Sequence, residues 1–197
     1  RLFRRQRQMC IRDSLKGGDP SVFGRLDEEL AALSEYGIES SVVPGITSAS
    51  AGAASLKQSL TRRDRNSSIT FMTAHDAKGY AEHDWRQLVR SGQALAIYMG
   101  RKSASFLQGR LLMAGAGQDL VVTCVENISR TEERRFTTTL SSFAQRLDDD
   151  SWNGPLIIFV GIGQDRRVEV SSVSKVKEAT HGSVSYTHLR AHETEYD

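Results

Sequence analysis

Apolar residues recur along the chain in two spacings, and each spacing predicts one kind of element. Short runs rich in β-branched and aromatic residues predict buried strands, at residues 68–73, 95–99, 120–125, 134–139 and 156–160. Apolar residues three or four apart predict helices between these strands, at 84–90, 102–114 and 141–147. Because strands alternate with helices, we expect an α/β fold with a largely parallel sheet, with room for an antiparallel strand at its solvent edge.

A further helix is predicted nearer the start of the chain. Leu26, Leu30 and Leu33 follow helical spacing. The acidic residues 27–29 fall in the first turn, where the helix dipole favours negative charge. Gly37 is suited to end this helix.

A glycine turn precedes this helix in the stretch LKGGDPSVFGR, residues 15–25. Adjacent Gly17 and Gly18 allow positive φ angles and close backbone approach. Asp19 can cap a helix or bind a polar group, and Pro20 rigidifies the turn. Taken alone, the GGDP loop is equally compatible with a surface turn.

A second glycine turn follows in VVPGITS, residues 42–48. The β-branched residues predict a short strand at 40–43 that ends in the Pro-Gly turn. Thr47 can then cap a helix of small residues at 48–55, which permit close packing on a sheet or a ligand. Two strand–turn–helix elements of this kind predict one ligand crevice at the carboxyl ends of strands.

Charge and cysteine content narrow the class of protein. The 26 Lys and Arg against 24 Asp and Glu give a net charge of +2, which is far from the basic excess of a dedicated nucleic-acid binder. Cys10 and Cys124 form neither a disulfide framework nor a metal cluster, and the histidines lack metal-ligand spacing. Apolar runs are shorter than a membrane helix, and the basic start lacks the apolar region of a secretion signal. We therefore expect a cytoplasmic protein with no metal and with neither nucleic acid nor membrane as partner.

Three segments carry no clear core pattern. The charged residues 130–135 are expected to form a solvated loop. Residues 1–14 are rich in arginine and offer no β-branched run of the kind that a buried strand before Leu15 requires. Residues 171–197 show no periodicity either. We expect both ends to be disordered or non-native, and the native chain to be interrupted just before Leu15.

Several motifs, in order and at matching spacing, resemble the tetrapyrrole methylase family. They are Leu15–Pro20, Phe23–Arg25, Val42–Ser48 and Leu60–Asp64, which reads LTRRD where the family commonly has LTHRD. Later landmarks extend the resemblance to about residues 15–170, at Tyr98–Gly100, Glu126–Asn127 and Gly154–Ile157. Within the family, the GGDP and PGITS motifs are most similar to those of the uroporphyrinogen-III C-methyltransferases.

The resemblance implies a fold with two α/β domains and a ligand crevice between them. Residues 15–66 are then the remnant of an incomplete first domain with its linker, and residues 67–170 are the second domain. The implied reaction transfers methyl groups from S-adenosylmethionine to two ring carbons of uroporphyrinogen III and gives precorrin-2, on the way to sirohaem or cobalamin. Complete members are usually homodimers.

The resemblance also assigns site residues. Those implied to hold S-adenosylmethionine are Gly17, Gly18, Asp19, Val22, Thr47, Ser48, Met99 and Ile128. Ile128 stands where Gly or Ala is usual, so its side chain would narrow the adenosine slot, and the Pro155-Leu156 turn is a further neighbour. Those implied to meet the substrate are Arg25, Arg62, Arg63 and Asp64. Arginine suits this role because the substrate carries carboxylates that its guanidinium can bind in a bidentate manner.

The family's proton-transfer residues and a first glycine-rich loop would precede Leu15. No catalytic residue can therefore be named, and the fragment is expected to be less competent than a complete enzyme.

Two alternatives to this function stay open at this point. Another precorrin methyltransferase is the nearest alternative. A non-catalytic module that binds an adenosine ligand is the other.

Overall fold

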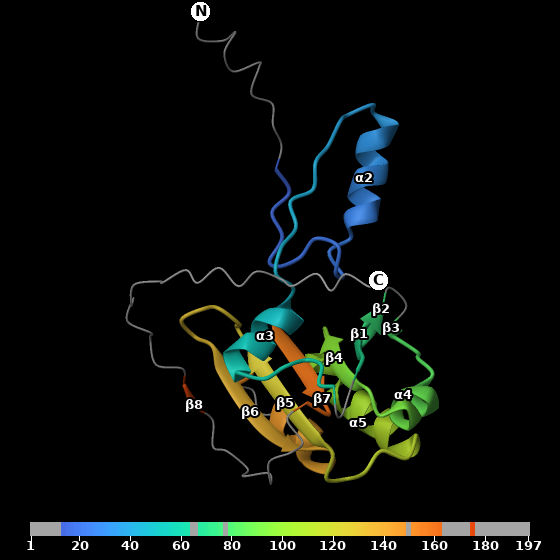
Figure 1. The fold of residues 1–197 in the computed structure, drawn as a ribbon, viewed down its shortest axis with the longest axis vertical. Helices are drawn as coiled ribbons and strands as arrows, with labels where there is room; N and C mark the ends of the chain where they lie inside the picture. Colours follow the sequence, from blue (N-terminus) through green and yellow to red (C-terminus); the bar gives the residue numbers. More distant parts are fainter. Residues whose placement is uncertain (1–12, 64–66, 77–78, 149–150, 163–173, 176–197) are drawn as a thin grey trace, which may run out of the picture.

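The computed structural model describes residues 13–63, 67–76, 79–148, 151–162 and 174–175 (Figure 1). Its helices are α2 (Leu26–Glu35), α3 (Ser48–Leu56), α4 (Trp85–Ser91), α5 (Ala104–Met113) and α6 (Phe143–Leu147), with 3-10 turns at Arg101–Ser103 and Leu140–Ser142. Its strands are β1 (Ile69–Thr73), β2 (His75–Asp76), β3 (Gly79–Tyr80), β4 (Ala94–Tyr98), β5 (Val121–Glu126), β6 (Arg134–Thr139), β7 (Leu156–Val160) and β8 (Ser174–Lys175). The expected α/β class is confirmed, and the strands and helices predicted between residues 68 and 160 are present with small shifts at their ends.

The central sheet has the strand order β1-β4-β7-β5-β6-β8. Among its described pairs, β1 and β4 are parallel, and the other four pairs are antiparallel. The expectation of a largely parallel sheet is therefore wrong. The strands that α5 joins, β4 and β5, do run in the same direction, but β7 lies between them and runs the opposite way. A strand–helix–strand pattern predicts the relative direction of two strands, and it does not reveal which strand is inserted between them.

Side chains alternate along the strands and divide the core between the two faces of the sheet. On one face, Leu95 and Ile97 of β4 pack in a cluster with Leu107 of α5. On the other face, Ala94 and Ala96 of the same strand pack in a cluster that includes residues of α3 and β7. The small side chains on this second face allow α3 to lie directly on the sheet, as Figure 1 shows.

Residues 13–47 form an arm that projects from the sheet and carries both glycine turns (Figure 1). The predicted helix is present as α2, and Gly37 follows it at φ 62°. None of the residues of α2 is buried. The strand expected at 40–43 is absent, and Val43 is 80% exposed. A β-branched run becomes a strand only where a neighbouring strand completes its hydrogen bonds, and no described strand pairs with this segment.

Several expectations fall wholly or partly outside the described residues. Those for residues 1–14 and 171–197 do so except at 13–14 and 174–175. The division of the chain near residue 66 stays a prediction. In the part of the chain that the structure describes, no helix is both long enough and apolar enough to cross a membrane.

Candidate functional site

A cavity of about 380 Å³ lies where the arm meets the ends of the central strands. Its lining comes from the first glycine turn, the start of α3, the end of β4, the loop after β5 and the start of β7. The lining residues are Lys16, Gly17, Gly18, Asp19, Val22, Phe23, Gly24, Thr47, Ser48, Tyr98, Met99, Ile128, Arg130, Pro155, Leu156 and Ile157. The cavity thus opens at the carboxyl ends of β4 and β5, and residues of both glycine turns line it, although no described strand precedes either turn.

The two glycine turns touch each other along the arm side of the cavity. A Cβ atom on Gly45 would lie 2.4 Å from the carbonyl oxygen of Gly18, so only glycine permits this approach. A Cβ atom on Gly24 would lie 2.2 Å from the carbonyl oxygen of Pro20. Both turns are therefore fixed by backbone contact, and the first turn also brings the side chains of Lys16, Val22 and Phe23 to the cavity.

Asp19 organises the first turn. Its Oδ1 accepts a hydrogen bond from the Ser21 backbone N–H at 2.8 Å and another from the Ser21 hydroxyl. These two bonds lower the pKa of the Asp19 carboxyl, and the backbone N–H of Gly45 in the second turn adds to the effect. The carboxylate therefore acts in the turn itself, and it does not cap an α-helix.

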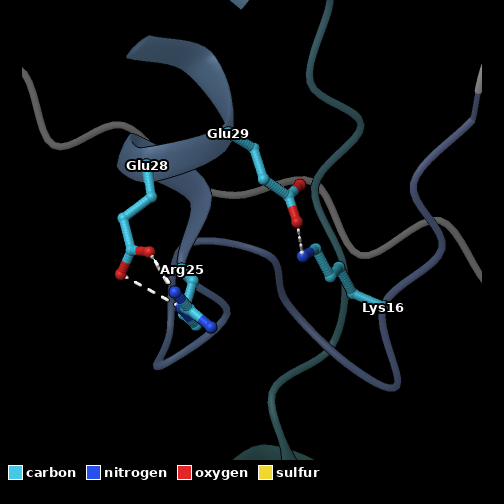
Figure 2. Close-up of polar contacts among 4 residues, drawn as sticks. All are labelled: Lys16, Arg25, Glu28 and Glu29. Carbon is cyan, nitrogen blue, oxygen red and sulfur yellow. Dashed lines mark hydrogen bonds and ion pairs between the residues drawn. The ribbon is translucent and has the colours of Figure 1, made fainter. Parts of the chain in front are cut away.

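Two basic side chains of the first turn are paired with acids of α2. Figure 2 shows Glu29 reaching from the helix to Lys16, and Glu28 facing Arg25. The Arg25 Nε atom lies 3.1 and 3.0 Å from the two Glu28 carboxylate oxygens. Lys16 lines the cavity with its charge already compensated, and Arg25 points along the helix in an exposed pair.

The sheet side of the cavity is built from unusual backbone. Met99 follows β4 at φ 55°, and Ile128 lies between Asn127 at φ 52° and Ser129 at φ 63°. Non-glycine residues rarely adopt the left-handed conformation, and such residues cluster at functional sites when the surrounding structure holds them there. The chain thus turns sharply at Met99 and on both sides of Ile128, and both residues line the cavity.

A fully buried carboxylate supports this wall from behind. Glu126 Oε2 accepts from Arg134 Nε at 2.8 Å, and its Oε1 accepts from the Gly154 backbone N–H at 2.6 Å. The Arg134 guanidinium also lies 4.4 Å from the centre of the Trp152 ring. The backbone N–H of Asn127 donates to the Pro155 carbonyl at 2.9 Å. These contacts tie the loop after β5 to the start of β7.

Tyr98, the last residue of β4, connects the sheet to the arm and to α3. Its hydroxyl lies 2.5 Å from the Thr47 hydroxyl and accepts from the Ala49 backbone N–H at 3.2 Å. Its ring centre lies 4.8 Å from that of Phe23 in the first turn. Thr47 occupies the N-cap position of α3, but its side chain makes no capping bond. The expected cap is therefore wrong in its detail, because the Thr47 hydroxyl is engaged by Tyr98.

The residues expected to hold S-adenosylmethionine and those expected to meet substrate are placed differently. All of the former line the cavity: Gly17, Gly18, Asp19, Val22, Thr47, Ser48, Met99 and Ile128. Pro155 and Leu156 line it too. Of the latter, Arg25, Arg62 and Arg63 are exposed and do not line it. Asp64 lies outside the described residues.

Among the lining residues to which the sequence gave no role are Phe23, Tyr98 and Arg130. Phe23 and Tyr98 belong to motifs that the sequence analysis quoted, so their positions beside Gly24 and Met99 were the available signal. Arg130 offers no signal of this kind, because charged loop residues are common on protein surfaces.

The solvated loop that its charge predicted at 130–135 is present only at residues 130–132, which are exposed, whereas Arg134 and Arg135 belong to β6. Glu133 is 8% exposed, and its carboxylate accepts from the Ser129 backbone N–H at 2.8 Å and from the Ser55 hydroxyl. Arg135 donates to the Ser55 carbonyl at 2.6 Å. Glu133 and Arg135 thus hydrogen-bond to Ser55 at the end of α3, a contact that a linear sequence does not reveal.

Within the described part of the chain, cysteine and the potential metal ligands add no further reactive group to this site. Cys124 is buried in β5, as its apolar surroundings predicted, and burial raises the pKa of its thiol. Across the described residues, no group of three or more His, Cys, Asp and Glu side chains is arranged to hold a metal ion.

A comparison of the sequence with models of protein families identifies the class of protein that has this fold and cavity. The family model described as "Tetrapyrrole (Corrin/Porphyrin) Methylases" matches residues 14–144. The chain belongs to this family.

Two curated members are similar in sequence to this chain over three quarters of its length. The uroporphyrinogen-III C-methyltransferase of Bacillus subtilis is 40% identical over 149 residues, which are 75% of this chain and 31% of that protein. The siroheme synthase of Chromobacterium violaceum is 39% identical over 147 residues, which are 75% of this chain and 31% of that protein. This chain thus spans about a third of the length of these curated relatives.

A solved structure is similar over a larger share of its length. It is the uroporphyrin-III C-methyl transferase of Thermus thermophilus complexed with S-adenyl homocysteine. The similarity has a TM-score of 0.67 and 29% sequence identity, and it covers 81% of this chain and 69% of that one.

Proposed function

We propose that this chain takes part in the S-adenosylmethionine-dependent C-methylation of uroporphyrinogen III to precorrin-2, a precursor of sirohaem and cobalamin. The observation that carries the proposal is the cavity, because every residue that the resemblance assigned to the methyl donor lines it. The similarity to a methyltransferase crystallised with S-adenosylhomocysteine supports the same ligand class.

The cavity fits an adenosyl ligand in size and in lining. Its volume of about 380 Å³ lies within the range of roughly 300–1,000 Å³ that small-molecule sites occupy. The glycine turns offer backbone donors and acceptors on one side. The apolar side chains of Met99, Ile128 and Leu156 offer a surface for a flat aromatic base on the other.

When bound, S-adenosylmethionine supplies a methyl group on a positively charged sulfur, which a carbon nucleophile attacks. This chain's own residues contribute binding and orientation. The turn at Gly17–Asp19 and the start of α3 at Thr47–Ser48 would hold the donor from the arm, and the left-handed backbone at Met99 and around Ile128 would hold it from the sheet. Holding the donor in one orientation lowers the entropic cost of a transfer.

The substrate would contact residues outside the donor cavity, namely Arg25, Arg62, Arg63 and Asp64. The substrate is larger than the donor and carries carboxylates at its edge, so its partners need not line the donor's cavity. Exposed guanidinium groups are suited to such carboxylates. Arg25 would have to exchange its Glu28 partner for one of them.

We also propose a cytoplasmic, homodimeric complete protein with a first unit at 15–66 and a second at 67–170. Exposed apolar side chains on the arm support association, since Val43 and Ile46 are 80% and 72% exposed. The buried free thiol of Cys124 is compatible with a reducing compartment. Sedimentation of a form of the protein as long as its relatives tests the homodimer, and a monomer there would overturn this part.

The central test separates binding from turnover. The chain is titrated with S-adenosylhomocysteine by calorimetry and then assayed for transfer of a labelled methyl group from S-adenosylmethionine to uroporphyrinogen III. Binding with only very slow transfer is the expected result. Binding without transfer would favour the non-catalytic adenosine-binding module, and the absence of binding would overturn the proposal.

A variant pair shows whether any binding uses this cavity. Asp19→Asn alters the cavity turn and should weaken binding, whereas Asp27→Asn alters an exposed acid of α2 and should not. Equal affinities of the two variants would place the ligand elsewhere.

A further inference from the structure

We propose that Tyr98 is a positioning residue that holds both glycine turns over the sheet and thereby fixes the width of the cavity. The role of Tyr98 is an inference from contacts within the chain. Its consequence for ligand affinity rests on the proposed function.

The first step concerns the hydroxyl of Tyr98. The first N–H groups of a helix have no partner within the helix and need one from elsewhere. In α3, the Ala49 N–H donates to the Tyr98 hydroxyl at 3.2 Å, and the N-cap side chain of Thr47 supplies no cap. A hydroxyl can accept this bond and donate its own proton to the Thr47 oxygen, 2.5 Å away. One side chain from β4 thus replaces the missing cap and fixes the second glycine turn.

The second step concerns the ring. It contacts Phe23 of the first glycine turn with ring centres 4.8 Å apart, and Phe71 of β1 with ring centres 6.1 Å apart. Both separations suit attractive aromatic pairs. The ring therefore anchors the first turn while the hydroxyl anchors the second.

The third step concerns the backbone on which Tyr98 stands. Tyr98 pairs with Thr73 at the end of the parallel β1–β4 ladder, so its Cα position is fixed by the sheet. The next residue, Met99, turns away at φ 55° and lines the cavity from the sheet side. Adjacent residues thus define the two sides of the cavity: Met99 lines the sheet side, and Tyr98 sets how far away the arm lies.

Tyr98→Phe tests this role because it removes the hydroxyl and keeps the ring. The dissociation constant for S-adenosylhomocysteine should rise about tenfold. The melting midpoint should fall by only about 2–4 °C, the effect of losing one helix-cap bond, because the ring remains and no core side chain changes. Tyr98→Leu, which also removes the ring contacts, should weaken binding further.

Tyr80→Phe is the matched control. Tyr80 is also a tyrosine with a phenylalanine neighbour, since its ring centre lies 4.5 Å from that of Phe106, but it is more exposed than Tyr98 and does not line the cavity. Its loss of a hydroxyl should leave affinity unchanged. An affinity loss in Tyr80→Phe equal to that in Tyr98→Phe would overturn the proposal.

Hydrogen exchange in the absence of ligand gives a second readout that is independent of the proposed function. In Tyr98→Phe, the Ala49 amide should exchange at least about tenfold faster, while amides in β5 and β7 keep their rates. An unchanged Ala49 rate would overturn the positioning role, even if binding weakens. If the parent chain binds no S-adenosylhomocysteine, the proposed function fails, and the Ala49 rate alone decides the role of Tyr98.

Discussion

Leu30 on α2 and Leu107 on α5 occupy similar positions in amphipathic helices, yet Leu107 is fully buried and Leu30 is only half-buried. Both helices begin and end close to where the sequence predicts. The comparison teaches that local signals suffice to place a helix in either region. They do not reveal whether the region has a partner surface that buries the apolar face.

The same contrast separates the two sides of the cavity. The sheet side rests on a continuous core, with both faces of the sheet covered. The arm side rests on contacts between glycine turns, on exposed ion pairs and on Tyr98. We therefore expect changes in the sheet to alter stability, and changes in the arm to alter ligand affinity.

The largest expected effect is on the sheet. Phe159→Ala removes a fully buried ring between the sheet and Gly52 of α3, and it should cost about 3–5 kcal/mol of unfolding free energy. Leu30→Ala on the arm should cost about 1 kcal/mol or less. Chemical denaturation followed by circular dichroism measures both. A cost for Leu30→Ala as large as that for Phe159→Ala would contradict the comparison and make the arm part of the same core.

The next effect concerns the buried ion pair. Glu126→Gln removes the buried carboxylate that accepts from Arg134 and from the Gly154 N–H, and it should cost about 1–3 kcal/mol, because Arg134 is partly exposed and keeps the Ser151 carbonyl as a partner. Glu132→Gln, on the exposed loop of the same hairpin, should stay within about 0.5 kcal/mol of the parent. The same denaturation experiment compares them. Similar costs for the two variants would show that the Glu126 carboxylate is not needed behind the cavity wall.

The third prediction concerns the contact between the two glycine turns of the arm. Gly45→Ala forces a Cβ atom toward the Gly18 carbonyl, so the two turns must separate, and affinity for S-adenosylhomocysteine should fall about tenfold or more. The melting midpoint should move by only about 2 °C or less, because the arm shares little of the core. Gly117→Ala, where an added Cβ atom meets nothing within 4 Å, is the control. A large loss of stability without a loss of affinity in Gly45→Ala would reverse the assignment of the two regions.

The sequence predicts features that depend on neighbouring residues, and it misses features that depend on residues far apart in the chain. The strands at 134–139 and 156–160 were predicted with their observed bounds, because alternation and apolar runs are local. The position of β7 between β4 and β5 was not predicted, because no local signal encodes which strands are neighbours. The expected strand at 40–43 failed for a related reason, since a strand needs a pairing partner that its own residues cannot supply.

The candidate site shows the same limit. Its glycine turns were visible in the sequence because glycine and proline constrain backbone directly. The role of Tyr98 was not visible, because its partners Thr47 and Phe23 lie far from it in the chain. The pairing of Glu133 with Ser55 was hidden in the same way. Contacts between distant segments assemble the cavity, and single-residue patterns do not report them.

The smallest expected effect is the pH dependence of the first glycine turn. Hydrogen bonds from Ser21, and a weaker one from Gly45, lower the pKa of the Asp19 carboxyl below its ordinary value of 3.8. A carboxyl whose pKa is lowered by folding stabilises the folded turn fully at pH values above its ordinary pKa. It loses this stabilising contribution as the pH falls through the lowered pKa. Protonation of Asp19 would weaken the Ser21 bonds that shape the cavity turn, so affinity for S-adenosylhomocysteine should be flat from pH 8 to about pH 5 and decline only below 3.8. Asp19→Asn, which keeps an acceptor oxygen and loses the charge, should remove the pH-dependent part of that decline, whereas Asp27→Asn should keep it. Calorimetric titration across this range is the measurement, and a decline centred near pH 6 in the parent chain would assign the titration to a group other than Asp19.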